Sequence, residues 1–334
     1  IDARKKPDIF YNFKLGVEFI DEKIENKFKN QKINIENKKL NYEKLNSSVR
    51  PIVIGFGPSG MFSALCFARM GLKPIVFEQG ECVEKRIESV NKFWKEGKLN
   101  TFSNVQFGEG GAGTFSDGKL NTNLNNEYCK YVIDELYLHG APKEITYINK
   151  PHIGSDNLTK VVKNFREEII SLGGEINFDT KLVDITVENN KVTKITLKNV
   201  VTNEEYTKKC DCLVLCLGHS ARDTFKLLKN LGVKINQKPF AMGVRIEQKT
   251  ENVNLMQYGK NDINLPNADY KLVTHLPNGR SVFTFCMCPG GVVVSSSSNE
   301  NEIVTNGMSY FARDNKFSNS ALLVNVMPSD YESD

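Results

Sequence analysis

The sequence predicts an α/β fold in which parallel strands alternate with helices and a β-rich region follows. The apolar run Pro51 to Ile54 leads into a glycine-rich turn and a helix-like segment, and a second apolar run ends at Phe77. From Val233 onward short alternating segments predominate. With 334 residues, the chain exceeds what one hydrophobic core usually serves, so we expect more than one structural unit.

The composition is that of a globular protein, with 40% hydrophobic and 25% charged residues. The longest apolar runs, such as Leu213 to Leu217, fall far short of the roughly 20 residues that a membrane helix needs. Ile1 to Tyr11 lacks the apolar core of a secretory signal. We therefore expect a cytoplasmic chain without a membrane span. The formal net charge of +4 gives no support to nucleic-acid binding.

Residues 1–48 are expected to form a partial N-terminal β-α-β appendage and a linker. Ile9 to Ile20 alternates apolar and polar residues, Asp21 to Asn30 is charged and compatible with a helix, and Ile33 to Ile35 suits a second strand. Asn41 to Val49 has no apolar period and suits the linker. The chain begins and ends without the signals of a domain end, which predicts a fragment lacking both termini.

Residues 49–232 are expected to form the main α/β domain. A helix from Ser59 to Met70 would connect the two apolar strands as a β-α-β unit. The remaining predicted elements are helices over Asn126 to Leu138 and Asn157 to Leu172, a β-meander over Leu182 to Val187, Val192 to Leu197 and Tyr206 to Lys208, and a buried strand over Leu213 to Leu217.

Residues 233–334 are expected to form a β-rich substrate domain that is incomplete at its C-terminus. Leu272 to Leu276 and Ser281 to Phe285 flank an Asn-Gly pair, which is typical of a β-hairpin turn.

The hexamer Gly55-Phe-Gly-Pro-Ser-Gly60 matches the GxGxxG dinucleotide fingerprint in the expected context, between a strand and a helix. Glu78 ends the next strand, 18 residues after Gly60. In such a unit Gly55 permits the tight turn, Gly57 admits a pyrophosphate and Gly60 allows close helix packing, while the acidic residue accepts from a ribose. The pattern therefore predicts a Rossmann-like dinucleotide site.

The acidic residue suits NAD or FAD and argues only against NADP. Two further glycine-bearing segments favour FAD. Gln106 to Lys119 offers many free amides and little bulk, as a flat ring system and its phosphates require, and Leu213 to Gly218 is an apolar strand that ends in glycine.

At these residues the chain resembles the glutathione-reductase-type flavoproteins, and more narrowly a bacterial family of FAD-dependent (NAD(FAD)-utilising) dehydrogenases. The resemblance covers nearly the whole chain. Its specific stretches are Val53 to Leu65, Asn104 to Thr122, Lys150 to Leu158, Leu217 to Phe225 and Phe285 to Val294. The late strand and glycine-acid-glycine turn that complete the FAD site in such proteins have no counterpart here.

The resemblance implies a set of FAD contacts. Gly57 to Gly60 would hold the pyrophosphate, Glu78 the adenosine ribose and the backbone near Leu182 the adenine, while Arg86 would make a second pyrophosphate contact and Gly113 to Leu120 would lie beside the isoalloxazine. The full predicted set is Gly55, Gly57, Pro58, Ser59, Gly60, Glu78, Gln79, Arg86, Gly113, Thr114, Ser116, Gly118, Lys119, Leu120, Leu182 and Gly218.

The predicted function is that of an FAD-dependent oxidoreductase that transfers hydride or electrons to or from a small molecule or a redox partner. The candidate catalytic residues are Lys119, which would stabilise negative charge on reduced flavin, and His219, which follows the end of a predicted strand. NAD(P)H is a candidate electron donor, although only one dinucleotide fingerprint is present. A flavoprotein that modifies RNA and a non-catalytic nucleotide-binding module remain alternatives.

The eight cysteines are expected to be reduced and mostly buried. Two pairs have CxC spacing, Cys210 with Cys212 and Cys286 with Cys288. Structural zinc favours CxxC knuckles, so no metal site is predicted. For Cys286 and Cys288 the sequence favours burial as small hydrophobes over a redox pair.

Overall fold

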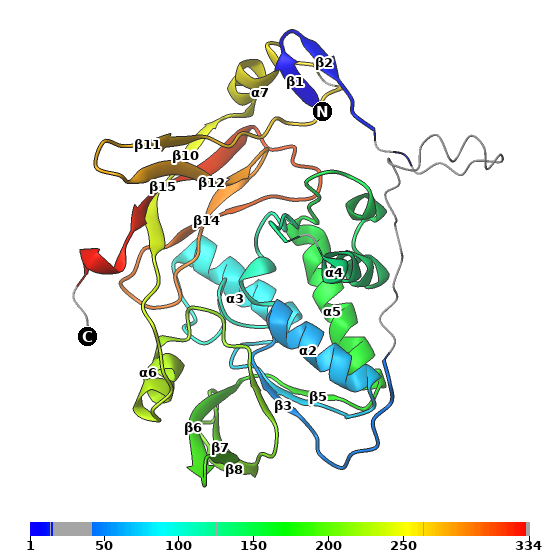
Figure 1. Cartoon of the computed structure of the whole chain (residues 1–334), viewed down its shortest axis with the longest axis vertical. Helices are drawn as coiled ribbons and strands as arrows, with labels where there is room; N and C mark the ends of the chain where they lie inside the picture. Colours follow the sequence, from blue (N-terminus) through cyan, green and yellow to red (C-terminus); the bar gives the residue numbers. More distant parts are fainter. Residues whose placement is uncertain (14, 16–41, 125, 263, 332–334) are drawn as a thin grey trace, which may run out of the picture.

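The computed structural model describes residues 1–13, 15, 42–124, 126–262 and 264–331 (Figure 1). At the N-terminus, β1 (Asp2–Lys5) and β2 (Asp8–Phe10) form an antiparallel hairpin. The helix predicted over Asp21 to Asn30, the strand over Ile33 to Ile35 and most of the strand over Ile9 to Ile20 lie outside the described residues.

A four-stranded parallel sheet forms the centre of the α/β part, and it confirms the predicted fold class. Its strands lie in the order β5-β4-β3-β9, and every neighbouring pair is parallel. The strands are β3 (Ile52–Ile54), β4 (Ile75–Phe77), β5 (Glu175–Asn177) and β9 (Leu213–Leu215). Because all of them run the same way, their carboxyl ends lie along one edge of the sheet.

Apolar side chains cover both faces of this sheet, as the continuous apolar runs of its strands require. Val53 and Val76 pack against α2 and α5 on one face, whereas Ile52, Ile54 and Phe77 pack toward the meander and α6 on the other. The covering elements are α2 (Pro58–Arg69), α5 (Ser155–Ser171), β6 (Thr180–Glu188), β7 (Lys191–Asn199), β8 (Glu205–Lys209) and α6 (Arg222–Asn230). The predicted meander is therefore confirmed.

Helix α4 (Glu127–Leu138) begins and ends close to its predicted bounds. Three helices were not predicted: α3 (Val83–Glu96), α6 and α7 (Thr250–Tyr258). Short 3-10 helices span Gly111–Gly113, Lys143–Thr146 and Pro328–Asp330. No helix in the described part of the chain is both long and apolar enough to span a membrane.

The β-rich region contains an antiparallel sheet in the order β10-β15-β12-β11 and a separate hairpin. The sheet strands are β10 (Phe240–Lys249), β11 (Val273–His275), β12 (Ser281–Cys288) and β15 (Phe317–Val326), and the hairpin strands are β13 (Val292–Ser295) and β14 (Thr305–Met308). The predicted Asn-Gly hairpin joins β11 to β12: Leu276 N–H donates to Arg280 O at 2.7 Å, and Gly279 has a φ of +81°.

Side-chain contacts connect the β-rich region to the α/β part. Trp94 Nε1, on α3, donates to the carbonyl of Ser295 at 2.9 Å. Asp117 accepts two hydrogen bonds from Arg313, at 2.9 and 2.5 Å, and a third from Ser309. The loop that carries Asp117 is thus held against the β-rich region by a buried ion pair.

Candidate dinucleotide site

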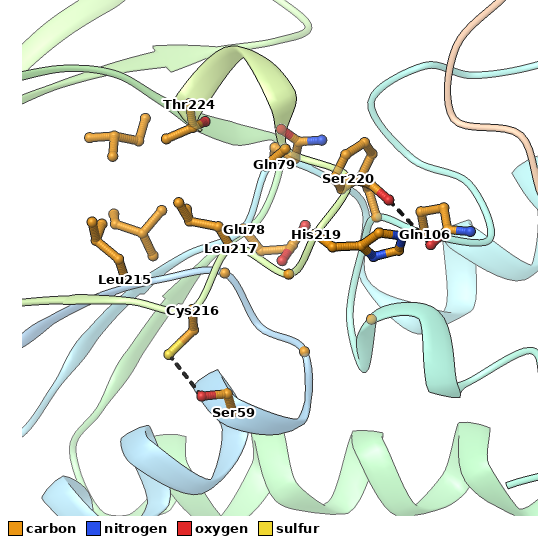
Figure 2. A pocket seen from close by; sticks show the side chains of 18 of the residues that line it. Ser59, Glu78, Gln79, Gln106, Leu215, Cys216, Leu217, His219, Ser220 and Thr224 are labelled. Atoms are coloured by element: carbon orange, nitrogen blue, oxygen red, sulfur yellow. Dashed lines mark hydrogen bonds between the residues drawn. The ribbon is translucent and has the colours of Figure 1, made fainter. Parts of the chain in front are cut away.

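A cavity of about 650 Å³ opens at the carboxyl edge of the parallel sheet (Figure 2). Strands β3, β4 and β9 each end at its wall, at Ile54, Phe77 and Leu215, and the residues that follow them line it. Its volume falls within the range of about 300–1,000 Å³ that small-molecule and cofactor sites occupy. In an open α/β sheet this edge is where ligands bind.

Two glycines of the fingerprint are required by packing. Gly55 has a φ of +95°, and a Cβ there would lie 2.4 Å from the carbonyl oxygen of Cys216. A Cβ on Gly60 would lie 1.9 Å from the carbonyl oxygen of Gly55. Any side chain at either position would therefore force the turn after β3 away from β9 or from helix α2.

Gly57 differs from these two glycines. Packing does not require a glycine there, but the absence of a side chain leaves open space in the cavity. Its backbone is extended (φ −75°), and the nearest atom to a Cβ placed there would be Gly111 Cα at 3.6 Å, an ordinary contact distance. Among the described residues no side chain caps the N-terminus of α2, so the amides of its first turn are available to a ligand. This combination suits an anion such as a pyrophosphate.

The carboxylate of Glu78 joins three backbone segments around the cavity. Its Oε2 accepts from Phe56 N–H at 2.7 Å, and its Oε1 accepts from Gly80 N–H at 2.9 Å and Gly108 N–H at 3.0 Å. The side chain is 5% exposed and lines the cavity. One lone pair of Oε2 remains for a ribose hydroxyl, so Glu78 has a structural role beside the predicted binding role.

The second glycine-rich segment folds over Arg86, which does not line the cavity. The guanidinium is fully buried and donates to the carbonyls of Asn104, Val105, Glu109 and Gly111 at 2.5–3.1 Å. Burial lowers the pKa of Arg86 to about 10, which leaves it a cation at neutral pH. Its donors are occupied by the loop, so the direct pyrophosphate contact implied by the resemblance does not fit this arrangement.

Glu109, in the same segment, is a buried carboxyl group beneath the N-terminus of α3. Its Oε2 accepts from Val83 N–H at 2.7 Å and from Arg166 Nη1 at 3.1 Å, whereas its Oε1 has no hydrogen-bond partner among the described residues. Burial raises the pKa of Glu109 to about 7, and only part of that rise is offset by the Val83 amide and Arg166.

The segment after β9 forms the other wall of the cavity (Figure 2). Ser59 Oγ lies 3.3 Å from Cys216 Sγ, which ties the start of α2 to this segment, and Ser220 Oγ lies 3.4 Å from Gln106 Oε1. His219 lies beside Gln106 at the end of the cavity away from Leu215. The strand predicted over Leu213 to Leu217 is shorter and less buried than expected: β9 ends at Leu215, which is 37% exposed, three residues before Gly218, where a Cβ would meet no described atom within 4 Å.

The structure brings together ten of the predicted residues as cavity lining and places the others around it. The lining residues are Gly55, Gly57, Pro58, Ser59, Glu78, Gln79, Gly113, Leu182, Gly218 and His219. Gly60, Arg86, Thr114, Ser116, Gly118, Lys119 and Leu120 do not line it. Lys181, Ser220 and Thr224 also line the cavity, although the sequence did not predict them. Their signal was weak because they lie on elements whose position depends on the tertiary fold.

Lys119 is directed at the β-rich region. Its Nζ lies 3.0 Å from Asp117 Oδ2 and 3.4 Å from Cys288 Sγ. Burial alone would raise the pKa of Asp117, but Arg313 and Lys119 hold it at about 2, so the carboxylate stays ionised. Thr114 and Ser116 bond within their own loop, to Glu109 O at 3.3 Å and to Gly113 O at 2.6 Å.

The cavity fits the adenosine and pyrophosphate part of FAD. Gly57 leaves room at the uncapped start of α2, Glu78 retains an acceptor, and a Cβ on Gly113 would meet no described atom within 4 Å. The residues that would hold the cofactor are therefore Gly57, Ser59, Glu78 and Gly113, together with the backbone at Leu182.

Comparisons with known proteins relate one part of the chain to FAD-dependent proteins. Residues 239–334 match a family model described as "FAD-dependent protein, C-terminal domain-like". An uncharacterised protein of Clostridium beijerinckii is 49% identical over 346 aligned positions, which cover 99% of this chain and 63% of that protein. The chain therefore spans less than two thirds of the length of this relative.

Solved structures with a similar arrangement of elements are remote. The glycerol-3-phosphate dehydrogenase of Bacillus halodurans complexed with FAD is 11% identical, with 86% of this chain and 49% of that chain covered and a TM-score of 0.40. The anhydrotetracycline hydroxylase OxyS of Streptomyces rimosus is 13% identical, with 85% and 46% covered and a TM-score of 0.41. The match of residues 239–334 to an FAD-dependent family is more specific than these structural similarities.

Proposed function

We propose that the chain is part of an FAD-dependent oxidoreductase of the bacterial family of FAD-dependent dehydrogenases that its sequence resembles. One observation carries the proposal: the uncapped start of α2, the open side of Gly57 and the carboxylate of Glu78 all border one cavity at the carboxyl edge of the parallel sheet. The family match of residues 239–334 supports FAD over NAD as the occupant.

Each residue of the chain has a binding or positioning task in this proposal. The first turn of α2 would donate backbone hydrogen bonds to the pyrophosphate, and Glu78 would accept one from the adenosine ribose. Arg86 would hold the second glycine segment in place through its four carbonyl contacts. When bound, FAD supplies the capacity to transfer hydride or single electrons, which no amino-acid side chain provides.

A Gly57→Ala variant tests the cofactor site with little risk to the fold. The native φ of −75° suits alanine, and the new methyl group would lie at an ordinary contact distance, 3.6 Å, from Gly111 Cα. It would stand where the pyrophosphate must approach, so we expect the dissociation constant for FAD to rise at least about tenfold, or 1.4 kcal/mol. Fluorescence titration of the flavin-free protein with FAD measures this change.

Gly97→Ala is the matched control. Gly97 ends α3 with a φ of +71°, and a Cβ there meets no described atom within 4 Å. Alanine at this left-handed position should cost about 1 kcal/mol of stability and leave FAD affinity unchanged. Equal FAD affinity in the Gly57→Ala variant and the native protein would argue against the site.

Anaerobic mixing of the FAD-loaded protein with NADH or NADPH tests the oxidoreductase part of the proposal. Loss of the oxidised flavin absorbance with one of them would identify a nicotinamide as the electron donor. No loss with either, combined with reduction by dithionite, would direct the search to a protein or another small molecule as donor.

A further inference from the structure

Strand β12 contains a β-bulge at the second CxC pair. Phe285 pairs with Ala321 and Cys288 pairs with Asn319, so three steps along β12 correspond to two along β15. Cys286 occupies the left-handed region with a φ of +47°, which is rare for a residue with a side chain. Strained backbone of this kind persists where the surroundings enforce it, and it is enriched at functional sites.

The bulge brings the two cysteines closer together than a regular strand would. Two steps of extended strand separate Cα atoms by about 6.6–6.8 Å, at the upper limit of what a disulfide spans. The extra residue compresses β12 between Phe285 and Cys288, since its three steps match two on the partner strand. Cys288 Sγ lies 3.4 Å from the carbonyl oxygen of Cys286, and both thiols are free.

Two cationic side chains lie beside this pair. Lys119 Nζ lies 3.4 Å from Cys288 Sγ, and Arg245 Nη1, from β10, lies 3.2 Å from the carbonyl oxygen of Cys286. Gly307, on β14, leaves room for the thiol and the guanidinium because it has no side chain: a Cβ there would lie 2.7 Å from Cys288 Sγ and 2.5 Å from Arg245 Nη1. Arg245 Nε is buried without a partner among the described residues.

The charges favour a thiolate on one of the two sulfurs. The hydrogen bond from Cys288 lowers the pKa of Cys286, and Lys119 and Arg245 lower it further, whereas burial and Asp117 oppose them. The same thiol contact and burial raise the pKa of Cys288. In the other CxC pair, burial raises the pKa of Cys210.

Accessibility divides the pair in the same way. Cys286 is partly exposed, whereas Cys288 is fully buried. The sequence favoured a structural role for both thiols, but neither strain at Cys286 nor a lysine at Cys288 serves simple packing. From this geometry we propose that Cys286 and Cys288 form a redox-active dithiol that reduces small disulfide substrates, with Cys286 as the attacking sulfur and Cys288 as the resolving one.

The reaction follows ordinary thiol–disulfide exchange. The Cys286 thiolate attacks one sulfur of the substrate disulfide, a Cys286–substrate disulfide forms, and one substrate thiolate leaves. Cys288 then attacks Cys286 Sγ while its proton passes to the second departing sulfur, which leaves as a thiol. The dithiol loses two electrons and becomes the Cys286–Cys288 disulfide, and the substrate disulfide gains those electrons.

Alkylation of the reduced native protein with iodoacetamide, followed by peptide mass spectrometry, tests whether Cys286 is a thiolate near neutral pH. An ordinary thiol with a pKa near 8.5 reacts roughly 75-fold faster at pH 8 than at pH 6, because its thiolate fraction rises by that factor. We expect the rate at Cys286 to change less than about threefold over this range. Replacing the cation, as Lys119→Gln, should make the rate at Cys286 more strongly pH-dependent. An ordinary profile at Cys286 in the native protein would overturn the proposal.

Reaction of the flavin-free protein with hydroxyethyl disulfide tests whether Cys286 and Cys288 act together as a redox dithiol. We expect a loss of two hydrogens confined to the peptide that contains Cys286 and Cys288. The Cys288→Ser variant should retain a stable mixed disulfide on Cys286, and Cys286→Ser should remain reduced. The double variant Cys210→Ser/Cys212→Ser is the matched control and should oxidise like the native protein. Oxidation of Cys210 and Cys212 at the same rate, or none at Cys286, would contradict the proposal. Neither assay requires flavin, so its outcome is independent of the proposed function.

Discussion

The carboxylate of Glu78, at the end of β4, accepts a hydrogen bond of 2.7 Å from the backbone N–H of Phe56, inside the glycine turn that follows β3. The same carboxylate accepts from Gly80 and from Gly108 in the second glycine segment. One buried side chain thus fixes both glycine segments relative to the sheet. The shape of the candidate dinucleotide site and the stability of the fold therefore depend on the same residue.

We expect Glu78→Ala to destabilise the flavin-free protein as well as to weaken FAD binding. The substitution leaves three backbone amides without an acceptor, and each unsatisfied buried amide costs about 1–3 kcal/mol. The free energy of unfolding should fall by about 3–5 kcal/mol, and Glu78→Gln, which keeps one acceptor oxygen, should lose roughly 1–3 kcal/mol. Urea denaturation without FAD measures both. A loss below about 1 kcal/mol for Glu78→Ala would show that the carboxylate serves only the ligand.

Arg86→Met should release the second glycine segment. The variant removes the donors of four short carbonyl contacts in a fully buried position, so we expect a loss of about 3–5 kcal/mol and faster proteolysis within residues 104–111. Lys85→Met, at the neighbouring exposed position, is the control and should change neither quantity. If Arg86→Met were as stable as the control, the carbonyl contacts would not be what holds this segment.

Glu109 should make stability depend on pH near neutrality. Its folded pKa of about 7 lies above the ordinary value of 4.5, so the folded protein binds the proton more tightly than the unfolded chain. The contribution of this group is therefore present below about pH 4.5 and is lost as the pH rises to about 7. Relative to Glu109→Gln, the native protein should lose about 3 kcal/mol across this window. Denaturation curves at pH 5, 6 and 7 measure the difference, and a difference that does not change with pH would contradict the assignment.

The ion pair between Asp117 and Arg313 should contribute to the contact between the two parts of the chain. Arg313→Met leaves the Asp117 carboxylate, 1% exposed, without its bidentate partner; because Lys119 remains 3.0 Å away, the cost should fall below the roughly 3–5 kcal/mol of a fully uncompensated buried charge. A double-mutant cycle with Asp117→Asn should show strong coupling. The exposed pair Arg222 and Glu302, at 2.8 Å, is the control and should show far weaker coupling. Similar coupling in both cycles would mean that burial adds nothing to the first pair.

Local sequence signals predicted the sheet, the meander and the glycine turn, because each depends on residues that are close in the chain. The run Pro51 to Ile54, the acidic end of β4 and the Asn-Gly turn all lie where the sequence indicated. Helix α3 was not predicted, although Val83, Ile87, Val90 and Trp94 recur at helical spacing. Charged and polar residues fill most of the positions between these four, which is the pattern of an amphipathic helix, so the sequence does carry a signal for α3.

Tertiary relationships could not be predicted from the sequence alone. The burial of Arg86 depends on the path of a loop some 20 residues away, and the contact of Lys119 with Cys288 joins residues 169 positions apart. The bulge in β12 depends on the register against β15, which no feature of the CxC spacing specifies. In the structure Arg86 donates to the carbonyls of a loop, and Lys119 contacts the thiol of Cys288; their predicted roles toward the pyrophosphate and the flavin stay predictions.

Competition between nucleotides tests the central claim, that the cavity at the edge of the parallel sheet binds FAD through its adenosine and pyrophosphate part. The flavin-free protein is titrated with FAD alone and then in the presence of excess ADP or excess FMN. ADP carries the groups that Gly57, the start of α2 and Glu78 would contact, so it should displace FAD, whereas FMN should not. Displacement by FMN but not by ADP, or no FAD binding at all, would contradict the account.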